Sequence, residues 1–528
     1  MKKLIVSALS LCFGLAVQAD EKPNIIYILA DDLGYGDVQC LNPKRGKIPT
    51  PNMDKVAADG MKFTDAHTTS SVCTPTRYSI LTGRYNWRTK LQRHVLNGYG
   101  EALISPNRMT VPSFLKENGY NTTMIGKWHL GLGIATVDDG KARAKNDLKE
   151  KKGQGAFDPE ELSNIDWEKP ISGGPVDLGF DSWYGIPASL DFPPYVWIRN
   201  KNWVGEGTHV KAFHRNGPAT ADFEAIDVLG KLADESVKFI KEYKSEKPFF
   251  AYIPLPSPHT PILPTSEWQG KSGLGDYGDF VMQTDDFIGQ VVKALDESGL
   301  TENTLLIVTS DNGCSRQADF KDLESKGHFA SAQFRGSKAD IWEGGHRVPF
   351  LVKWPKVIKP ESESDLLICQ SDLLATCAAI VGKELPKNAG EDSENILPIF
   401  KSEIPNFSRK GIIHHSVSGH FAYREGDYKL ILAYGSGGWT YPNENKAIEA
   451  GAPKAQIYNL RKDVGEQKNL YVEQSELAER LLTQLKEYIN AGASVIGKES
   501  KNDAQIVLWK SESKGEEYQK TKELEVTK

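Results

Sequence analysis

Acidic residues follow two runs of apolar residues that have the character of buried strands. Asp31 and Asp32 come directly after the first run, and Asp311 and Asn312 follow the run 304–310. Ligands of parallel sheets gather at the carboxyl ends of the strands, and oxygen-rich clusters select hard metals such as calcium. A single Asp-Asp pair is more often a helix cap or a solvated turn. The second cluster favours a calcium site instead.

Basic side chains form a second group of residues that could do chemistry. Lys127 and His129 alternate along what reads as an extended segment, so we expect both to point the same way. A lysine supplies charge and a histidine supplies proton transfer near neutral pH, which suits a tetrahedral anion. His259 is flanked by prolines that restrict its backbone. Any one of these histidines, taken alone, would more often be structural.

Cys73 lies in a C-x-P-x-R pattern that ends at Arg77 and is followed by YSILTGR. This pattern resembles the maturation signature of type I sulfatases, and the segment 119–131 (GYNTTMIGKWHLG) resembles the second signature of that family. Lys338 precedes E-G-G-H-R-V-P as the corresponding lysine does in the family. The resemblance runs from about residue 22 to about residue 470. It is closest to the arylsulfatase A and N-acetylgalactosamine-6-sulfatase branch.

The resemblance implies a secreted bacterial sulfatase that hydrolyses sulfate monoesters on polysaccharides or oligosaccharides. It implies that a maturation enzyme oxidises Cys73 to formylglycine (3-oxoalanine), whose hydrate is the nucleophile. By motif position, the calcium ligands would be Asp31, Asp32, Asp311, Asn312 and modified Cys73. The residues around the sulfate would be Arg77, Lys127, His129, His259 and Lys338. In this scheme His259, assisted by Lys338, protonates the departing sugar oxygen, and His129 removes a proton from the hydrate.

Three other functions stay open from the sequence. One is phosphonate or phosphate monoester hydrolysis on the same scaffold, and another is glycan binding without catalysis if Cys73 is not matured. The third is a purely structural secreted protein. For the sugar itself, Asp191 opens an aromatic loop suited to stacking on sugar rings, although such loops are more often core. Further candidates for the sugar pocket are His214, His346, Arg347 and Trp439.

The elements that position these residues read as strands alternating with helices. Buried strands are predicted at 24–30, 248–254 and 304–310, and helices at 51–60 and 276–295. This alternation favours an α/β sandwich, and the resemblance implies the alkaline-phosphatase-like form, with a large, mostly parallel central sheet flanked by helices. Short runs after residue 411 and a helix at 475–489 predict a smaller C-terminal subdomain with an antiparallel sheet.

Composition and charge narrow the function classes. The chain has 528 residues, a net charge of −6 and a pI of about 6.1. A nucleic-acid-binding protein would normally carry a strongly basic face, so none is predicted, and a weakly acidic surface offers no long-range attraction for a sulfated substrate. The five cysteines after residue 19 leave four if Cys73 is consumed, which permits two disulfides or buried free thiols.

The domain plan is predicted from changes along the sequence. Residues 1–19 have a basic start, an apolar stretch too short to span a bilayer, and small residues at the expected cleavage site. This pattern predicts a signal peptide and export to a periplasm or the exterior. No other stretch is apolar enough for a membrane span. The remaining units are a catalytic domain, 20–400, with an insertion at 133–176 over or beside the site, a C-terminal subdomain, 401–497, and a charged extension, 498–528.

Overall fold

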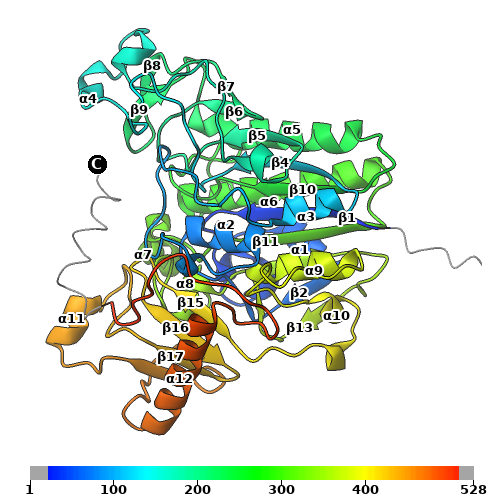
Figure 1. The fold of residues 1–528 in the computed structure, drawn as a ribbon, viewed down its shortest axis with the longest axis vertical. Coiled ribbons are helices and arrows are strands. Elements are labelled where there is room, and N and C mark those ends of the chain that lie inside the picture. Colours follow the sequence, from blue (N-terminus) through cyan, green and yellow to red (C-terminus); the bar gives the residue numbers. More distant parts are fainter. Residues whose placement is uncertain (1–21, 511–528) are drawn as a thin grey trace, which may run out of the picture.

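A ten-stranded sheet runs through the centre of the computed structural model, which describes residues 22–510 (Figure 1). Its strand order is β13-β2-β12-β11-β1-β10-β4-β5-β6-β7. The five central strands are parallel: β11 (Thr304–Ser310), β1 (Asn24–Ala30), β10 (Phe249–Pro254), β4 (Asn121–Lys127) and β5 (Ser182–Ile186). The outer strands are β12 (Phe350–Lys353), β2 (Met61–Phe63), β13 (Ser362–Ser364), β6 (Trp197–Arg199) and β7 (Asn202–Val204). β12 and β6 run antiparallel to their central neighbours, so the sheet is mixed at both ends.

The central strands are apolar on both faces because helices cover both. Successive side chains of a strand point to opposite sides, and in β1 Tyr27 and Leu29 enter one core while Ile26 and Ile28 enter the other. The first core is completed by helices α2 (Cys73–Thr82), α3 (Val111–Glu117) and α9 (Leu373–Ile380). The second is completed by α1 (Pro51–Ala58), α5 (Val228–Glu242) and α6 (Gly275–Glu297). The predicted α/β sandwich is confirmed.

A second, four-stranded antiparallel sheet carries the C-terminal helix, as predicted (Figure 1). Its strands are β15 (Ile412–His415), β16 (Phe421–Glu425), β17 (Tyr428–Ile431) and β18 (Gln456–Asn459), and α12 (Ser475–Ala491) packs on it. Leu481, Leu485 and Ile489 of the helix share one core with the sheet. The sequence had given no sign of β16, whose mixed composition lacks an apolar run.

Shorter elements connect these layers. Two small pairs of strands are β3 (Ala66–His67) with β14 (Ile368–Cys369), and β8 (His209–Ala212) with β9 (Asn216–Ala219). The short helices are α4 (Leu148–Lys151), α7 (Phe320–Ser325), α8 (Glu343–His346), α10 (Leu397–Phe400) and α11 (Glu444–Glu449). In Figure 1 the β8–β9 projection and the C-terminal sheet lie at opposite ends of the molecule, with α2 between them.

The last described residues are fixed against the body of the protein. The guanidinium of Arg84 is buried and contacts the Asp503 carboxylate at 3.0 Å, and Arg88 donates to the Asn502 side chain at 3.0 Å. Trp509 packs on the core of the C-terminal sheet. The predicted signal peptide lies outside the described residues, as do residues 511–528 of the predicted extension.

The sequence left open disulfides or free thiols, and predicted no membrane span after the signal peptide. All five cysteines among the described residues are free thiols, and four of them are buried. Within residues 22–510, no helix combines the length and the apolar character that a membrane crossing requires.

Candidate metal and anion site

Three carboxylates meet at the carboxyl edge of the central sheet. Ala30 and Ser310 are in register on β1 and β11, so the residues after them lie side by side. The backbone N–H of Asp311 donates to the carbonyl of Ala30 at 3.1 Å, and that of Asp32 donates to Oδ1 of Asp311 at 3.3 Å. The side chains of Asp31, Asp32 and Asp311 are all buried. The residues expected to share a cation are therefore neighbours.

Three cations from other elements neutralise these carboxylates. Lys127, the last residue of β4, contacts Asp31 through its ammonium group. Arg77 of α2 donates from Nε to Asp311 Oδ2 at 2.9 Å, and the Lys338 Nζ lies 2.7 Å from Asp32 Oδ1. The Arg77 guanidinium also lies 3.5 Å from Asp31 Oδ2 and donates to the Lys127 carbonyl at 3.1 Å. All six charged groups are buried.

The residues present fit a calcium ion. Asp31 Oδ1 and Asn312 Oδ1 are buried oxygen atoms with no hydrogen-bond partner. Ligand atoms of Asp31, Asp32, Cys73 and His259 all lie within 4.8 Å of one another. Burial, and after it the nearby Asp31 carboxylate, raise the pKa of Asp311 to about 7. Crowded, buried hard oxygen donors are the set that calcium prefers.

Cys73 is the first residue of α2, whose N-terminus points into this site. The helix ends at Gly83, where a φ of +62° suits glycine and the N–H bonds back to Ser79. Burial raises the pKa of the Cys73 thiol to about 12, although Lys127 and Lys338 oppose the shift. A thiol with that pKa stays protonated at neutral pH, and the thiolate is the nucleophilic form. Unmodified Cys73 is therefore poorly suited to nucleophilic attack.

His129 presents a free acceptor nitrogen to the site. Its Nε2 lies 2.7 Å from the carbonyl oxygen of Leu96, which can only accept, so Nε2 carries the proton. Nδ1 is then the acceptor, and it is buried without a partner. Burial, with Lys127 and Arg77 adding to it, holds the pKa of His129 well below its usual range. The side chain is a neutral proton acceptor.

The extended segment expected through His129 is wrong. β4 ends at Lys127, and His129 has a φ of +58°, in the left-handed region. The alternation argument therefore does not hold beyond the strand. Both residues nevertheless lie against α2, because the Arg77 guanidinium donates to the Lys127 carbonyl at 3.1 Å and the Thr74 hydroxyl donates to the His129 carbonyl at 3.0 Å.

His259 approaches Asp32 from the loop after β10. Its Nδ1 lies 2.6 Å from the carbonyl of Thr260 and 3.1 Å from Oγ of Ser189. Nδ1 therefore donates to the Thr260 carbonyl, and Nε2 is left 3.6 Å from Asp32 Oδ2. The ring is fixed with Nε2 directed at the carboxylate cluster. Sequence reasoning had missed Ser189, as it had missed the Leu96 carbonyl, because no motif marks either position.

The residues expected around the sugar are divided among several places. Asp191 lies beside His259 and pairs with Arg215 at 2.7 Å. Burial would raise the pKa of Asp191, but His259 and Arg215 outweigh it and lower the pKa to about 2. His214 is exposed in the β8–β9 turn. Trp439 is 38% exposed on a loop whose backbone bonds to Asp340, two residues after Lys338.

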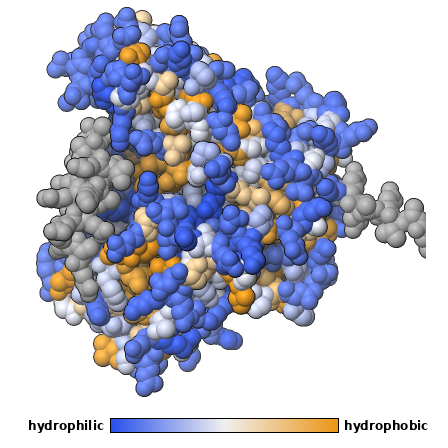
Figure 2. All heavy atoms as spheres, viewed as in Figure 1, coloured by the Kyte–Doolittle hydropathy of each residue, from blue (hydrophilic) through white to orange (hydrophobic). Residues whose placement is uncertain are grey.

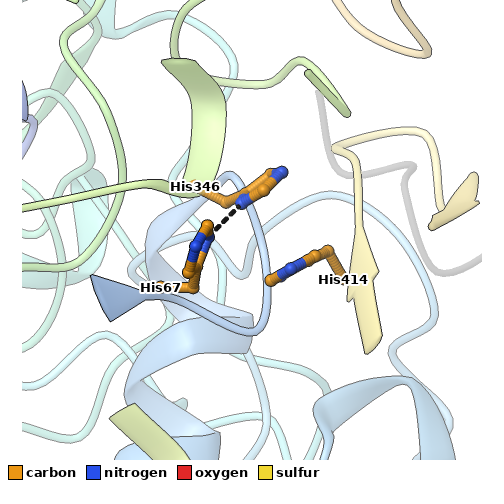
Figure 3. Close-up of side chains that lie close together, drawn as sticks. All are labelled: His67, His346 and His414. Carbon is orange, nitrogen blue, oxygen red and sulfur yellow. Dashed lines mark hydrogen bonds between the residues drawn. The ribbon is translucent and has the colours of Figure 1, made fainter. Parts of the chain in front are cut away.

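His346 lies in a separate buried cluster with His67 and His414 (Figure 3), and Arg347 lies at the edge of this cluster, paired with Asp65. Nδ1 of His67 is 3.0 Å from Nδ1 of His346, and the rings of His346 and His414 stack at 3.8 Å with a 14° angle. Nitrogen lone pairs lie in the ring plane, so two nearly parallel stacked rings cannot direct them at one ion. A shared metal ion does not fit this cluster.

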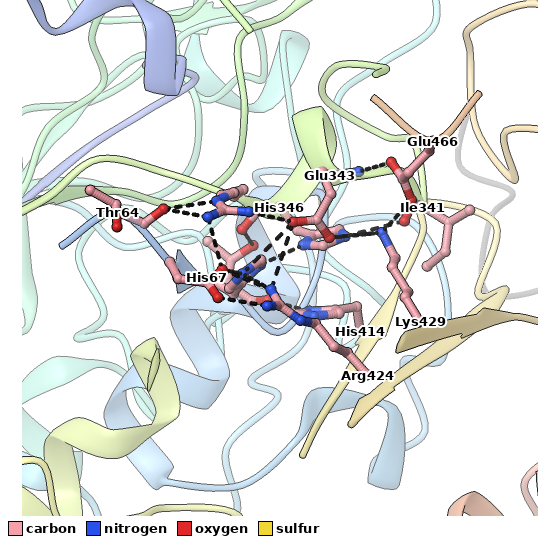
Figure 4. A network of polar contacts seen from close by, with 12 residues as sticks. Thr64, His67, Ile341, Glu343, His346, His414, Arg424, Lys429 and Glu466 are labelled. Atoms are coloured by element: carbon pink, nitrogen blue, oxygen red, sulfur yellow. Dashed lines mark hydrogen bonds and ion pairs between the residues drawn. The ribbon is translucent and has the colours of Figure 1, made fainter. Parts of the chain in front are cut away.

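Ion pairs surround the three histidines and join the layers of the central sheet to the C-terminal sheet (Figure 4). Lys429 of β17 contacts His346 Nε2 at 2.9 Å, and Arg424 of β16 contacts His67 Nε2 at 3.1 Å. Cations at these nitrogens also disfavour a metal ion. The carboxylates that balance the cations are Asp65, Glu343 and Glu466. The guanidinium of Arg347 is held there by Asp65 at 3.1 Å and Glu343 at 3.2 Å.

Comparison with known proteins gives two family matches. The family model described as "Sulfatase" matches residues 23–383. The model described as "N-sulphoglucosamine sulphohydrolase, C-terminal" matches residues 337–492. Together they cover the central sheet, the site at its carboxyl edge and the C-terminal sheet.

Individual relatives are similar over most of the chain. An N-acetylgalactosamine-6-O-sulfatase of Bacteroides thetaiotaomicron is 31% identical over 514 residues, with 88% of this chain and 92% of that protein covered. Arylsulfatase A of Homo sapiens is 30% identical, with 88% and 85% covered. A solved structure from work on glycosaminoglycan metabolism by Bacteroides thetaiotaomicron has a TM-score of 0.75 at 30% identity, with 88% and 99% covered.

Calcium should stabilise the folded protein through the carboxylate cluster. A ligand that binds only the native state at about 100 times its Kd adds about 2.7 kcal/mol to the free energy of unfolding. We expect calcium to raise the Tm above its value in chelator, and Asp32→Asn to abolish most of that rise. The measurement is thermal unfolding with and without calcium.

Asp276→Asn, a change of an exposed acid at the start of α6, is the matched control and should keep the calcium effect. The comparison uses the calcium-induced change in Tm, because Asp32→Asn also leaves Lys338 without its partner. An equal rise in the wild type and in Asp32→Asn would contradict this site.

The histidine cluster should make the protein acid-sensitive. Burial lowers the pKa values of His67, His346 and His414 from 6.5. Their neutral forms thus favour folding above the unfolded pKa, and this stability is lost as pH falls below it, by up to about 1.4 kcal/mol per pH unit for each group. His414→Phe, which keeps a ring beside His346, should reduce this slope by about one group's share.

Urea unfolding at several pH values between about 7.5 and about 5.5 measures how steeply the free energy of unfolding depends on pH. His214→Phe is the control, because His214 is already exposed in the folded protein and folding changes its surroundings little. If the free energies of unfolding of the wild type and His414→Phe fell in parallel, the cluster would not be the acid-sensitive element.

Proposed function

The chain belongs to the sulfatase family and is a sulfuric ester hydrolase, and from that premise we propose that it removes sulfate from sulfated carbohydrates. The reaction would use an oxidised Cys73 held beside calcium. The observation that carries this proposal is the convergence of three carboxylates, Cys73 and three buried cations at one edge of the sheet. A relative named as an N-acetylgalactosamine-6-O-sulfatase supports a carbohydrate substrate.

Charge in the site favours an anionic substrate. The carboxylates of Asp31, Asp32 and Asp311 are matched by Arg77, Lys127 and Lys338. When bound by Asp31, Asp32, Asp311, Asn312 and the modified Cys73, calcium would polarise the hydroxyl of the aldehyde hydrate for attack on sulfur. The lysines would then hold the oxygens of the sulfate group, whose negative charge shields sulfur from water. Fixed cations lower this barrier because they stabilise the charge that develops in the transition state.

Two histidines are suited to opposite proton transfers. Nδ1 of His129 is a neutral, unpartnered acceptor, so it would take a proton from the nucleophilic side chain. Nε2 of His259 faces Asp32, and Lys338 contacts the same carboxylate. Because Nδ1–H of His259 donates to the Thr260 carbonyl, the doubly protonated ring would give the proton on Nε2 to the departing sugar oxygen, since alkoxides are poor leaving groups. Ser189 and the Thr260 carbonyl would keep the His259 ring in place.

Maturation and export complete the proposal. Cys73, Pro75 and Arg77 are buried in α2, so the residues of the maturation motif are inaccessible once the domain has folded. A formylglycine-generating enzyme of the host would therefore act on Cys73 before the helix is packed. Residues 1–19 would direct the chain to the periplasm or the exterior, which suits extracellular sulfated glycans as substrates.

Oxidation of Cys73 should be required for turnover. We expect mass spectrometry of the tryptic peptide that ends at Arg77 to show the aldehyde in active protein. Cys73→Ala removes the nucleophile and should lower sulfate release from an aryl sulfate by roughly a thousandfold or more. The matched control is Cys40→Ala, at a half-buried thiol outside the site.

A Cys73→Ala protein with wild-type turnover, or active protein with an unmodified thiol, would refute this mechanism. A phenyl phosphonate ester serves as the competing substrate. Faster turnover of the phosphonate than of the sulfate ester would favour the phosphonate hydrolase alternative.

A further inference from the structure

A cavity of about 1640 Å³ lies beside the catalytic residues. Leu96 and Phe192 line it, and both also contact His129: the Leu96 carbonyl bonds to Nε2 at 2.7 Å, and the Phe192 ring centre lies 5.9 Å from the imidazole. The cavity therefore begins one residue away from the site. Its walls come mainly from the loop 89–109, from residues 132–134 and 139–142, from the segment 386–389, and from Ser500, Lys501 and Asp503.

We propose that this cavity, the chain-binding cleft, holds further sugar units of a sulfated glycan beyond the unit that carries the cleaved ester. The inference rests on the proposed function and extends it from a sulfated sugar to a sulfated chain. Pockets of about 300 to 1,000 Å³ enclose a drug-sized ligand. The cleft is larger than that range, so its size suits several sugar rings.

Positive charge in the lining suits an anionic chain. Six basic residues line the cleft, Lys90, Arg93, Arg108, Lys141, Arg215 and Lys501, against three acids, Glu101, Asp139 and Asp503. This local excess of cations contrasts with the net charge of −6 for the whole chain. Complementary charge raises association rates and selects partners of the opposite sign. Sulfate groups or uronic acids along a glycan have that sign.

Ion pairs occupy some of these charges but not all. Glu101 pairs with Lys141 at 3.3 Å, Arg108 pairs with Glu391 at 2.6 Å, and Arg215 pairs with Asp191 at 2.7 Å. Lys90 and Lys501 are exposed, and neither side chain has an ion-pair or hydrogen-bond partner within residues 22–510. These two ammonium groups are therefore available to a bound anion.

The wall that carries Lys501 is rigidly held. The buried guanidinium of Arg84 donates to the Lys501 carbonyl at 2.7 Å and to Asp503 Oδ1 at 3.0 Å. The N–H of Asp503 in turn donates to the Arg88 carbonyl at 2.7 Å, two residues before Lys90. Both lysines are thus presented by backbone that buried arginines fix, which lowers the ordering cost of binding.

Apolar and aromatic surface completes the cleft. Phe192 and Tyr99 lie in its lining, and the Arg215 guanidinium stacks 4.1 Å above the Phe192 ring centre. A sugar ring packs its apolar C–H face on such surfaces, and the Arg215 guanidinium is held over Phe192 by its ion pair with Asp191 at 2.7 Å. In Figure 2, hydrophobic and hydrophilic residues lie side by side between the lobe of β8 and β9 and the lobe of α12.

Chain-length dependence tests the proposal. Values of kcat/KM are compared for a 6-sulfated N-acetylgalactosamine and a chondroitin 6-sulfate hexasaccharide, for a sulfated galactose and a sulfated galactan hexasaccharide, and for 4-methylumbelliferyl sulfate. We expect the hexasaccharide of one series to exceed its monosaccharide by about tenfold or more, from added contacts of this type. The two series distinguish a glycosaminoglycan from a galactan.

The double variant Lys90→Glu/Lys501→Glu tests the role of charge. We expect the ratio of hexasaccharide to 4-methylumbelliferyl sulfate turnover to fall about three- to tenfold, the range for exposed charge pairs, and to fall less at high salt. Lys486→Glu, at an exposed lysine of α12 outside the cleft, is the matched control and should leave the ratio unchanged.

Binding to Cys73→Ala protein, measured by calorimetry, separates this inference from the proposed function. Tighter binding of a hexasaccharide than of its monosaccharide, weakened by the double charge reversal, supports the cleft even if no ester is turned over. Equal binding and equal kcat/KM for both lengths in both series would overturn the cleft, while turnover of 4-methylumbelliferyl sulfate would leave the sulfatase proposal standing.

Discussion

The structure depends on six buried charges that neutralise one another at the carboxyl edge of the sheet. Asp31 and Asp311 follow neighbouring parallel strands, while Lys127 ends a third strand and Arg77 comes from a helix. Away from water such charges interact strongly, and removing one partner of a buried pair costs about 3–5 kcal/mol because it strands the other. The helices on both faces of the sheet create this burial. The elements that form the core of the fold therefore also position the charges of the site.

A second group of buried charges of opposite sign joins the layers of the central sheet to the C-terminal sheet. There Arg424 and Lys429 reach across to Asp65 and Glu343, with three neutral histidines packed among them. The two clusters differ in what they offer to a ligand. The first has unpartnered oxygen and nitrogen atoms directed inward, whereas ring stacking and ion pairs engage most nitrogens of the second. The first is built for chemistry, and the second stabilises the junction.

Much of this could be predicted from sequence because buried parallel strands leave a clear pattern. The runs before Asp31 and Asp311 are apolar on both faces, so their ends, and the carboxylates at those ends, were evident. The long helix at 276–295 was recognised from the helical spacing of its apolar residues, and it spans 275–297. The outer strands β2, β6, β7 and β13 carry no such run, nor does β16, and the apolar run of β12 is short. They owe their conformation to pairing partners far away in the chain.

Side-chain placement was less accessible to sequence reasoning. The left-handed turn at His129 breaks the alternation that a strand would give, and the carbonyl of Leu96 that sets its tautomer has no sequence signature. Arg347 stands close to Lys338 in sequence, yet α8 turns it toward Asp65 and the junction. The spacing of residues along a chain predicts the direction of their side chains only while the backbone keeps a regular helix or strand conformation.

In the proposed reaction, the buried lysines and arginine beside the carboxylates have a consequence for turnover. The inorganic ion that leaves carries one more negative charge than the ester that entered, so these cations hold the product at least as firmly as the substrate. A site that binds its starting material through charge therefore tends to retain what it makes. Dissociation of free sulfate, rather than bond cleavage, would then set the pace, and tetrahedral oxyanions in the medium would compete for the same place.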